Sequence, residues 1–308
     1  MKKTVLSVFL AIVALYVLRA YHDQSRPSSV LGPTETGVSI LTDDFIEKLK
    51  KAGMLKNNPV VDPKQRLRLV SVPYLGFDGK NKTGQFVVLD AVAPYVVEIF
   101  KTLHAQNFKI HLIKPIYLPT DQNGVGCFFD RNIINGAQKS MHAYGLAIDV
   151  NPGQNPYIVR DPNQLKLKKP EEGKIEKKNP YTDRTHMQLG MIGEKEIAVF
   201  AQHGFNDWGG NWIPPRPLDY MHFQVPRAMA QLLAVMTPEH AAQFFSYHVR
   251  DLDLMKKMTY FCDPETPYDV YSEKEELVTE YKKSPDRFMQ EAENAMNANC
   301  DKKNSKIP

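Results

Sequence analysis

Residues 140–150 constrain the fold of this chain more than any other stretch. They read SMHAYGLAIDV, in which His142 and Asp149 lie seven positions apart among small and apolar residues. Side chains alternate between the two faces of a strand, so Asp149 would share one face of AIDV with Ala147, while its neighbours point into the core. The stretch therefore predicts a buried strand that presents one carboxylate to a cleft, with His142 folded back beside it.

Apolar patterns elsewhere in the chain predict strands and helices that do not alternate regularly. Residues 67–77 and 83–93 are rich in β-branched and aromatic residues, which is typical of strands. Residues 92–108 and 194–205 carry apolar residues at helical spacing, and residues 43–55 read as a short amphipathic helix. Because the strands and helices are segregated, we expect an α+β fold with a small, mainly antiparallel sheet flanked by helices.

A second stretch, LDYMHF at residues 218–223, supplies groups that would complete a metal site. Hydrolytic zinc sites use three protein ligands from His, Asp and Glu and leave a fourth position open. His142, Asp149 and His222 form such a set for one zinc ion. Asp219 lies three positions before His222 and is the candidate general base, because zinc lowers the pKa of water to about 7 and a nearby carboxylate can then take the proton.

Three more residues are candidates for contact with the substrate. Arg131, in CFFDRNI, would supply a cation for a developing oxyanion or for the carboxylate of the substrate. Ser140 would form an outer hydrogen bond that holds His142, and we also expect it to line the substrate site. Trp212, in WGGNW, either packs within its loop or forms a wall of a peptide groove. We assign it to substrate binding, and the packing interpretation stays open.

The combined motif resembles a known family. S-x-H-x-x-G-x-A-x-D, followed by W-G-G-x-W and D-x-x-H-F, is similar to the zinc D-alanyl-D-alanine carboxypeptidases and L-alanyl-D-glutamate endopeptidases that cut peptidoglycan stem peptides. The resemblance covers roughly residues 70–225 and implies a hedgehog/DD-peptidase-like fold. It implies zinc ligands, a catalytic carboxylate and a substrate-holding or oxyanion-holding arginine at the matching positions, which are His142, Asp149 and His222, then Asp219, then Arg131.

The chain departs from the family pattern in several places. Met141 stands where a polar or acidic residue is common, and Lys139 stands where tryptophan is frequent. The lysine-rich insert 165–178 and the region 226–308 are not explained by the resemblance. We expect residues 226–308 to form a helical C-terminal extension that packs on the catalytic domain and is dispensable for zinc binding.

The N-terminal residues predict export. Residues 1–20 read MKKTVLSVFLAIVALYVLRA, in which two lysines precede an apolar run, as in a secretory signal peptide. The residues before a potential cleavage point fit the small-residue rule poorly, which favours an uncleaved membrane anchor, although the run is shorter than the about 20 residues that span a bilayer. Both alternatives place the rest of the chain in the periplasm or cell envelope. A linker at 21–42 and a catalytic domain at 43–225 would follow.

Composition excludes some functions and leaves the cysteines open. Hydrophobic residues make up 43% of the chain, enough for a sizeable core, and the net charge is +4. No basic run is interleaved with aromatic residues, which argues against nucleic-acid binding. The absence of C-x-x-C from the sequence excludes a cysteine zinc site of that type. Cys262 and Cys300 are candidates for a disulfide, and three reduced thiols are the alternative.

These features predict an exported zinc metallopeptidase that acts on peptidoglycan stem peptides, with either carboxypeptidase or endopeptidase bond choice. A second hypothesis is a non-catalytic, zinc-containing binding or scaffold protein of the envelope on the same fold. Structural zinc sites are usually closed by four ligands, so a set of three with a carboxylate nearby favours the enzyme. A third hypothesis keeps the enzyme but replaces the cell-wall substrate with a free dipeptide or another peptide.

Overall fold

The computed structural model describes residues 36–116, 124–133, 136–158, 180–213, 216–251 and 275–304, with side chains to residue 297. Its strands are β1 (Gly37–Ile40), β2 (Leu67–Gly76), β3 (Asn81–Leu89), β4 (Lys109–Ile110), β5 (Leu112–Ile113), β6 (Gly124–Val125), β7 (Ala147–Asp149), β8 (Tyr157–Ile158), β9 (Asp207–Trp208), β10 (Leu218–Asp219) and β11 (His222–Gln224). Its α-helices are α2 (Asp43–Lys51), α3 (Pro63–Arg66), α4 (Ala93–Ala105), α5 (Glu194–Gln202), α6 (Arg227–Val235), α7 (Pro238–Arg250), α9 (Glu275–Lys283) and α10 (Pro285–Asn304). The predicted α+β class is confirmed.

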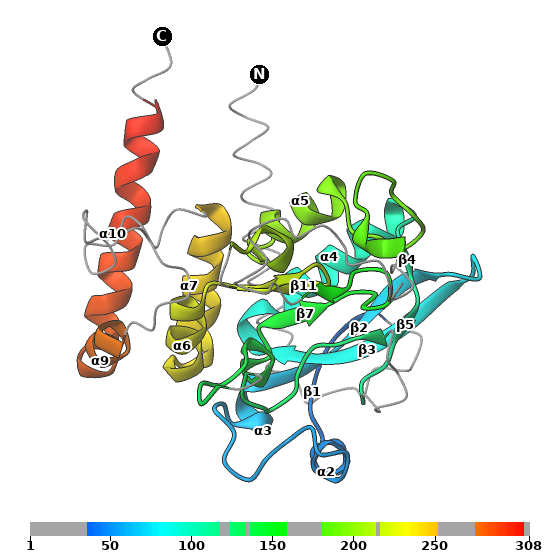
Figure 1. The fold of residues 1–308 in the computed structure, drawn as a ribbon. Helices are drawn as coiled ribbons and strands as arrows, with labels where there is room; N and C mark the ends of the chain where they lie inside the picture. Colours follow the sequence, from blue (N-terminus) through cyan, green and yellow to red (C-terminus); the bar gives the residue numbers. More distant parts are fainter. Residues whose placement is uncertain are drawn as a thin grey trace.

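The largest sheet consists of β1, β2 and β3 in antiparallel order, with β4 added parallel to β2. Helix α4 packs against this sheet through Ile99, Phe100 and Leu103, all fully buried. Pro94 stands in the first turn of α4, where a missing backbone N–H costs nothing. A smaller sheet of β7, β11 and β9 lies beside the larger one (Figure 1).

The linker prediction for residues 21–42 was wrong at its C-terminal end. Residues 37–40 form strand β1 and pair with residues 68–71 of β2. Thr42 then caps helix α2 by accepting a hydrogen bond from the backbone N–H of Phe45. The short apolar alternation of this strand follows a segment rich in Ser, Pro and Gly, so its pairing with β2 was not visible in the local pattern.

The predicted signal or anchor at 1–20 and the insert at 165–178 lie outside the described residues. Across the described ranges, no helix has both the length and the apolar character needed to cross a membrane. Cys127 is buried and is not in a disulfide. The side chains of Cys262 and Cys300 also lie outside the description.

The C-terminal region is helical, as predicted, but α6 does not stand apart from the preceding domain. Ala228, Met229 and Leu232 of α6 are almost fully buried and belong to the same hydrophobic core as the large sheet. Helices α7 and α9 pack against α6, and α10 packs against α7 and α9, on one side of the body (Figure 1). The predicted boundary at residue 226 therefore cuts through one hydrophobic core.

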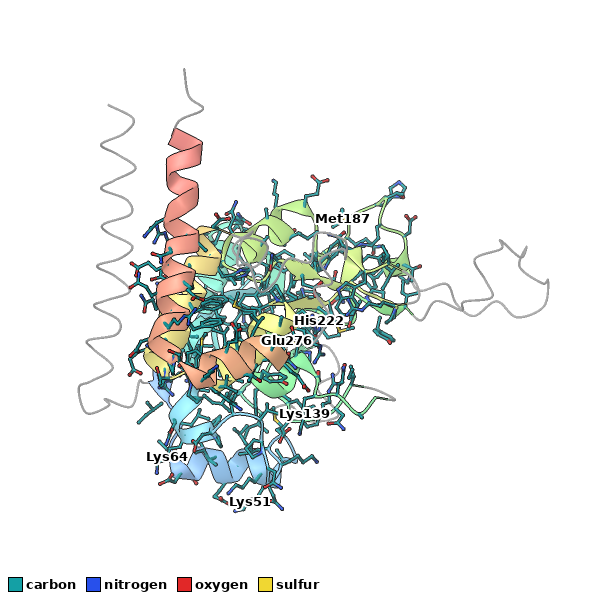
Figure 2. All side chains as sticks on the ribbon, turned by 90° about the vertical axis from the view of Figure 1, so that its left-hand side faces the viewer. Lys51, Lys64, Lys139, Met187, His222 and Glu276 are labelled. Atoms are coloured by element: carbon teal, nitrogen blue, oxygen red, sulfur yellow. The ribbon has the colours of Figure 1, made fainter. Side chains whose placement is uncertain are left out.

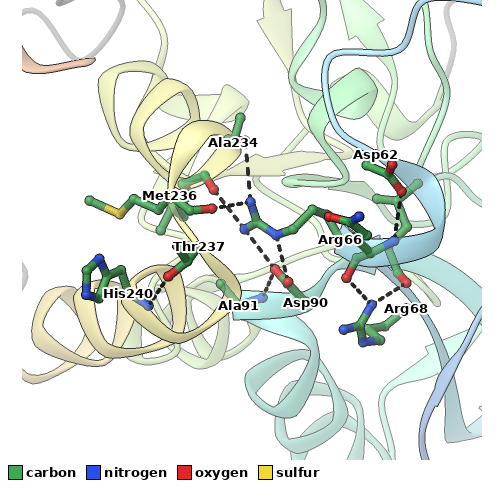
Figure 3. A network of polar contacts seen from close by, with 12 residues as sticks. Asp62, Arg66, Arg68, Asp90, Ala91, Ala234, Met236, Thr237 and His240 are labelled. Carbon is green, nitrogen blue, oxygen red and sulfur yellow. Dashed lines mark hydrogen bonds and ion pairs between the residues drawn. The ribbon is translucent and has the colours of Figure 1, made fainter. Parts of the chain in front are cut away.

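A buried ion pair ties α6 to the sheet (Figure 3). Arg66 and Asp90 are both almost fully buried, and the Arg66 guanidinium contacts the Asp90 carboxylate through two hydrogen bonds of 2.8 and 3.1 Å. The remaining guanidinium N–H groups donate to backbone carbonyls at the end of α6, which are those of Leu233, Ala234 and Met236. Arginine has five N–H donors, and all five are used here. This contact caps α6 and holds it against the sheet.

Candidate metal centre

The pairing of β7 with β11 brings two of the predicted ligands together. His222 lies directly opposite Asp149 in this antiparallel pair, and residues in that relation project from the same face of a sheet. His142 reaches them from the short 3₁₀ helix Met141–Tyr144, just before β7. Both histidines are buried, and Figure 2 shows His222 well inside the body. The structure therefore gathers all three predicted ligands, although they span 81 positions of the chain counting from His142 to His222.

The ligand atoms converge as a metal site requires. One donor atom from each of His142, Asp149 and His222 lies within 4.8 Å of the other two. His142 Nε2 is 3.2 Å from one oxygen of Asp149, and His222 Nδ1 is 2.8 Å from the other. Zinc bonds of about 2.0–2.2 Å place two ligands of a tetrahedral ion roughly 3.3 Å apart. These residues therefore fit a zinc ion.

Each imidazole has a hydrogen-bond partner on the side that faces away from Asp149. His142 Nδ1 is 2.5 Å from the backbone carbonyl of Cys127, which can only accept a hydrogen bond. Nδ1 must therefore carry the proton, and the Nε2 lone pair is free for a metal. In His222 the two ring nitrogens exchange roles: Nε2 lies 2.8 Å from the side-chain oxygen of Gln224, and Nδ1 faces Asp149.

Asp149 and His222 have pKa values that are shifted by their neighbours in the cluster. Burial raises the pKa of Asp149, but the charges and hydrogen bonds of His142 and His222 outweigh burial and hold it below its usual range. Burial lowers the pKa of His222, but its hydrogen bond to Asp149 and the charges of Asp149 and Asp219 raise that pKa to about 9. In the metal-free protein His222 therefore keeps a proton at neutral pH, and a metal ion must displace that proton to bind.

Asp219, the predicted general base, lies beside these ligands on β10. Burial raises the pKa of its carboxyl to about 6, as does the charge of Asp149, while the charges of His222, His142 and Arg131 oppose the rise. Its Oδ1 atom is buried and has no hydrogen-bond partner within the described part of the chain. Buried polar atoms are nearly always paired, so an unpaired carboxylate oxygen next to a ligand cluster marks a place where a substrate or water would bind.

A glycine of the WGGNW loop makes room for Asp219. A Cβ atom on Gly209 would lie 2.3 Å from the backbone oxygen of Asp219 and 2.8 Å from its Cβ. Gly145, in the first motif, has a left-handed backbone with φ of +69°. A Cβ there would lie 2.7 Å from the backbone nitrogen of Leu89 in β3. Gly209 therefore leaves room for Asp219, the candidate base. Gly145 lets the segment that carries His142 approach the large sheet.

Arg131 is held near Asp219 by a buried neighbour. Asp130 is fully buried and accepts hydrogen bonds from the Lys139 ammonium at 2.5 Å and from the backbone N–H of Lys56 at 3.2 Å. The backbone carbonyl of Arg131 accepts from the N–H of Ser140. Arg131 is close enough for its charge to lower the pKa of Asp219. Lys139, a departure from the family pattern, therefore helps to place the candidate substrate-binding cation.

The other two predicted substrate contacts have structural partners. Ser140 is buried, and its hydroxyl accepts a 3.4 Å hydrogen bond from the backbone N–H of His142, which matches the predicted outer hydrogen bond. Trp212 is also buried, with its ring centroid 5.3 Å from that of His222 and its indole N–H donating to Asp207. Both residues support the ligands, and their contact with a substrate stays a prediction.

The sequence interpretation missed three residues of the site, namely Asp130, Asp207 and Gln224. Gln224 had a usable signal, because it lies two positions after His222 in a strand and so shares its face. Asp130 and Asp207 had none, since no repeating pattern within one element links Asp130 to Lys56 or Lys139, or Asp207 to Gln224.

Comparison with known families gives one match. Residues 135–225 match the model of a family described as D-alanyl-D-alanine carboxypeptidase. The matched segment contains the three candidate ligands and Asp219, and it begins after Arg131. This match confirms the resemblance predicted from the motif and supports a peptidase. Neither the curated proteins nor the solved structures contain a match to the chain.

Proposed function

We propose that this chain is a zinc metallopeptidase that hydrolyses peptide bonds in peptidoglycan stem peptides. One observation carries the proposal: three ligand atoms converge within 4.8 Å beside the buried Oδ1 of Asp219, which has no hydrogen-bond partner among the described residues. A D-alanyl-D-alanine carboxypeptidase family match over the same residues supports the substrate class.

The donor set suits zinc, which prefers nitrogen and oxygen ligands in this number. A zinc ion bound by His142, Asp149 and His222 would polarise the scissile carbonyl and lower the pKa of the attacking water to about 7. The protein's own residues then handle the proton and the charge. Outer partners hold the two histidine ligands in place: the backbone carbonyl of Cys127 contacts His142, and the side-chain oxygen of Gln224 contacts His222.

Asp219 would take the proton from the attacking water and pass it to the leaving amine. Its pKa of about 6 leaves it mostly ionised at pH 7, so it can accept the proton, and it is basic enough to do so. Oδ1 has no hydrogen-bond partner in the part of the chain that the structure describes, and so it is available for the task. Arg131 would supply positive charge for the developing oxyanion or for the terminal carboxylate of the substrate.

A non-catalytic scaffold with the same zinc site is the second candidate. An unpaired buried carboxylate oxygen costs about 1–3 kcal/mol, and a scaffold would gain nothing from it. A three-ligand set without a fourth protein ligand among the described residues also favours catalysis. The orphaned oxygen of Asp219 therefore favours the enzyme.

We also propose that the protein works outside the cytoplasm, in the periplasm or cell envelope. Residues 1–20 supply the support, because their two lysines and apolar run are typical of a signal peptide or a membrane anchor. An envelope location would bring the site to its polymeric substrate.

Digestion of purified peptidoglycan by the full chain tests the proposal. Fragments would be identified by mass spectrometry, with and without a chelator, and after adding zinc back. Chelator-sensitive release of a terminal D-alanine would establish a carboxypeptidase, and a cut after the first L-alanine would establish an endopeptidase. The His142→Ala variant is the matched negative control. Zinc binding without any released fragment would overturn the proposal in favour of the scaffold.

A further inference from the structure

We infer that Gln224 and Asp207 are positioning residues that set the tautomer of His222 and so present its Nδ1 lone pair to the metal. The inference rests on the proposed zinc site. It gives a function to two buried residues that lie behind a ligand rather than among the ligands.

Three hydrogen bonds form a continuous relay behind His222. The indole N–H of Trp212 donates to Asp207 Oδ1 at 2.7 Å, and the Gln224 amide nitrogen donates to Asp207 Oδ2 at 2.6 Å. The Gln224 amide oxygen lies 2.8 Å from His222 Nε2. The side chains of Asp207 and Gln224 are both almost fully buried, so water does not compete for these bonds.

The direction of every bond in the relay follows from chemistry. An indole nitrogen can only donate, and an ionised carboxylate can only accept. Both Asp207 oxygens accept a hydrogen bond, one from Trp212 and one from Gln224, which is the pattern of an ionised carboxylate. Burial raises the pKa of Asp207, and the Trp212 hydrogen bond and the charge of Arg216 reduce that rise without reversing it. With its nitrogen committed to Asp207, Gln224 must turn its oxygen towards His222. His222 Nε2 must then carry a proton, which leaves Nδ1 as the nitrogen for the metal.

Strand register builds this arrangement into the small sheet. In β11, His222 pairs with Asp149 of β7 on one side, and Gln224 pairs with Asp207 of β9 on the other. His222 and Gln224 project from the same face of the strand, two positions apart. Asp149, His222, Gln224 and Asp207 therefore share one face of the small sheet. Asp149 lies on the metal-binding side of the His222 imidazole, and Gln224 and Asp207 lie on the supporting side.

The two histidine ligands differ in how they are held. His142 is fixed by the backbone carbonyl of Cys127, which no side-chain substitution removes. His222 depends on two side chains, and so its tautomer can be changed by mutation. This difference makes the inference testable at one ligand while the other serves as an internal reference.

Asp207→Asn should reverse the relay while changing the shape of the side chain very little. Trp212 still needs an acceptor, so the oxygen of the new amide would face the indole and the nitrogen of the new amide would face Gln224. Gln224 would then turn its oxygen to the new amide and its nitrogen to His222. His222 Nε2 would have to accept, which puts the proton on Nδ1 and blocks the metal ligand. We expect zinc affinity to fall by about 10–100-fold, the usual effect of losing an outer partner.

Adding Gln224→Glu to this variant should restore zinc binding. The amide nitrogen introduced at position 207 would donate to one oxygen of the carboxylate introduced at position 224, and the other oxygen of that carboxylate would accept from His222 Nε2. The acid and the amide have then exchanged places across one hydrogen bond. A merely structural role predicts that the second change adds damage, whereas the relay predicts an affinity within about threefold of the wild type, since outer partners act by orienting the ligand.

The experiment measures the zinc dissociation constant of the full chain by competition with a chelator, without peptidoglycan. Asp62→Asn, at the cap of α3, and Gln85→Glu, at a hydrogen bond to Ser71 in the large sheet, are matched controls and should bind zinc as the wild type does. Thermal unfolding checks that each variant folds. If Asp207→Asn does not fold, the double variant alone still decides, because the relay requires it to bind zinc like the wild type.

The outcomes separate the inference from the proposed function. Wild-type affinity in Asp207→Asn, or a double variant that binds no more tightly than Asp207→Asn, overturns the relay and leaves the peptidase proposal standing. The predicted loss and rescue, together with no release from peptidoglycan, supports the relay and contradicts only the peptidase. A wild-type chain that binds no zinc overturns both.

Discussion

The protein contains two buried clusters of charged side chains that differ in whether their hydrogen-bonding capacity is filled. In the Arg66–Asp90 pair every guanidinium N–H has an acceptor. In the metal centre three ligand atoms converge, and one carboxylate oxygen of Asp219 has no partner in the described part of the chain. A filled cluster stabilises the fold and has no capacity left for a ligand. A cluster in which ligand atoms converge beside an oxygen without a hydrogen-bond partner is suited to bind a metal ion and a substrate.

Removing a ligand should give the largest effect and is the strongest test of this difference. His142→Ala takes away one of three zinc ligands, so we expect bound zinc to be lost on dialysis, a larger effect than the about 10–100-fold expected for an outer partner. Metal analysis of the dialysed protein measures it. Retention of about one zinc ion per chain by His142→Ala would show that the metal binds elsewhere.

Breaking the filled cluster should damage stability instead. Arg66→Met leaves the buried Asp90 carboxylate without its cation, which typically costs about 3–5 kcal/mol of unfolding free energy. Denaturant unfolding of the metal-free protein measures the loss. Adding Asp90→Leu should recover part of it, because no unpaired charge then remains.

The exposed ion pair between Lys64 and Asp43 provides the control for that experiment. Lys64→Met should change the unfolding free energy by less than about 1 kcal/mol, since solvent-exposed pairs contribute little. An equal loss in Arg66→Met and Lys64→Met would contradict the role assigned to the buried pair.

His248 sharpens the comparison because it has an unpaired buried atom but no converging ligands among the described residues. Its Nε2 donates to the carbonyl of Gly204, and its Nδ1 has no partner in the described part of the chain. Burial lowers its pKa to about 4, although the Gly204 hydrogen bond and the charge of Asp251 oppose this. The unfolded chain therefore binds a proton at a higher pH than the folded chain does, and stability falls as the pH drops from about 6.5 towards 4.

His248→Gln should remove this pH dependence while keeping a donor for Gly204. Between pH 7 and pH 5 we expect the wild type to lose about 2 kcal/mol more unfolding free energy than the variant. Denaturant unfolding at the two pH values measures the difference. Equal losses in both proteins would show that His248 does not control the acid response.

The smallest expected effect separates ligand support from ordinary capping. Ser140→Ala removes the hydroxyl that accepts from His142 N–H and should cost about 1 kcal/mol of stability, together with some zinc affinity. Thr42→Ala removes a similar cap from α2 and should cost stability alone. Chelator competition and unfolding of both variants test this. Unchanged zinc affinity in Ser140→Ala would mean that its hydroxyl only caps the short helix.

The sequence predicted the parts of the molecule that local patterns determine. His142 and Asp149 share one short motif with strand alternation, and His222 follows Asp219 in another, so the candidate ligands could be named before the fold was seen. The helix over residues 92–108 was visible from its apolar spacing and was found at Ala93–Ala105. Periodicity of this kind reflects one face of one element, which requires no knowledge of the partner.

Long-range contacts were beyond that reasoning. Arg66 donates a 2.6 Å hydrogen bond to the backbone carbonyl of Met236, which lies 170 residues later in the chain. Through this contact Arg66 caps the C-terminal end of α6. No local pattern indicates that α6 enters the core, so the sequence predicts residues 226–308 only as a helical extension that packs on the catalytic domain. The same holds for Asp207 with Gln224, whose pairing depends on the register of β9 and β11 rather than on spacing in one segment.

The most direct test of the central claim measures bound zinc and turnover together in Asp219→Asn. This change keeps the size of the side chain but removes the group that takes the proton. The account predicts that about one zinc ion per chain remains and that release from peptidoglycan falls by about 10²–10⁴-fold, the usual contribution of a general base. Turnover close to the wild type with zinc bound would contradict the role of Asp219, and with it the claim that this cluster is a catalytic centre.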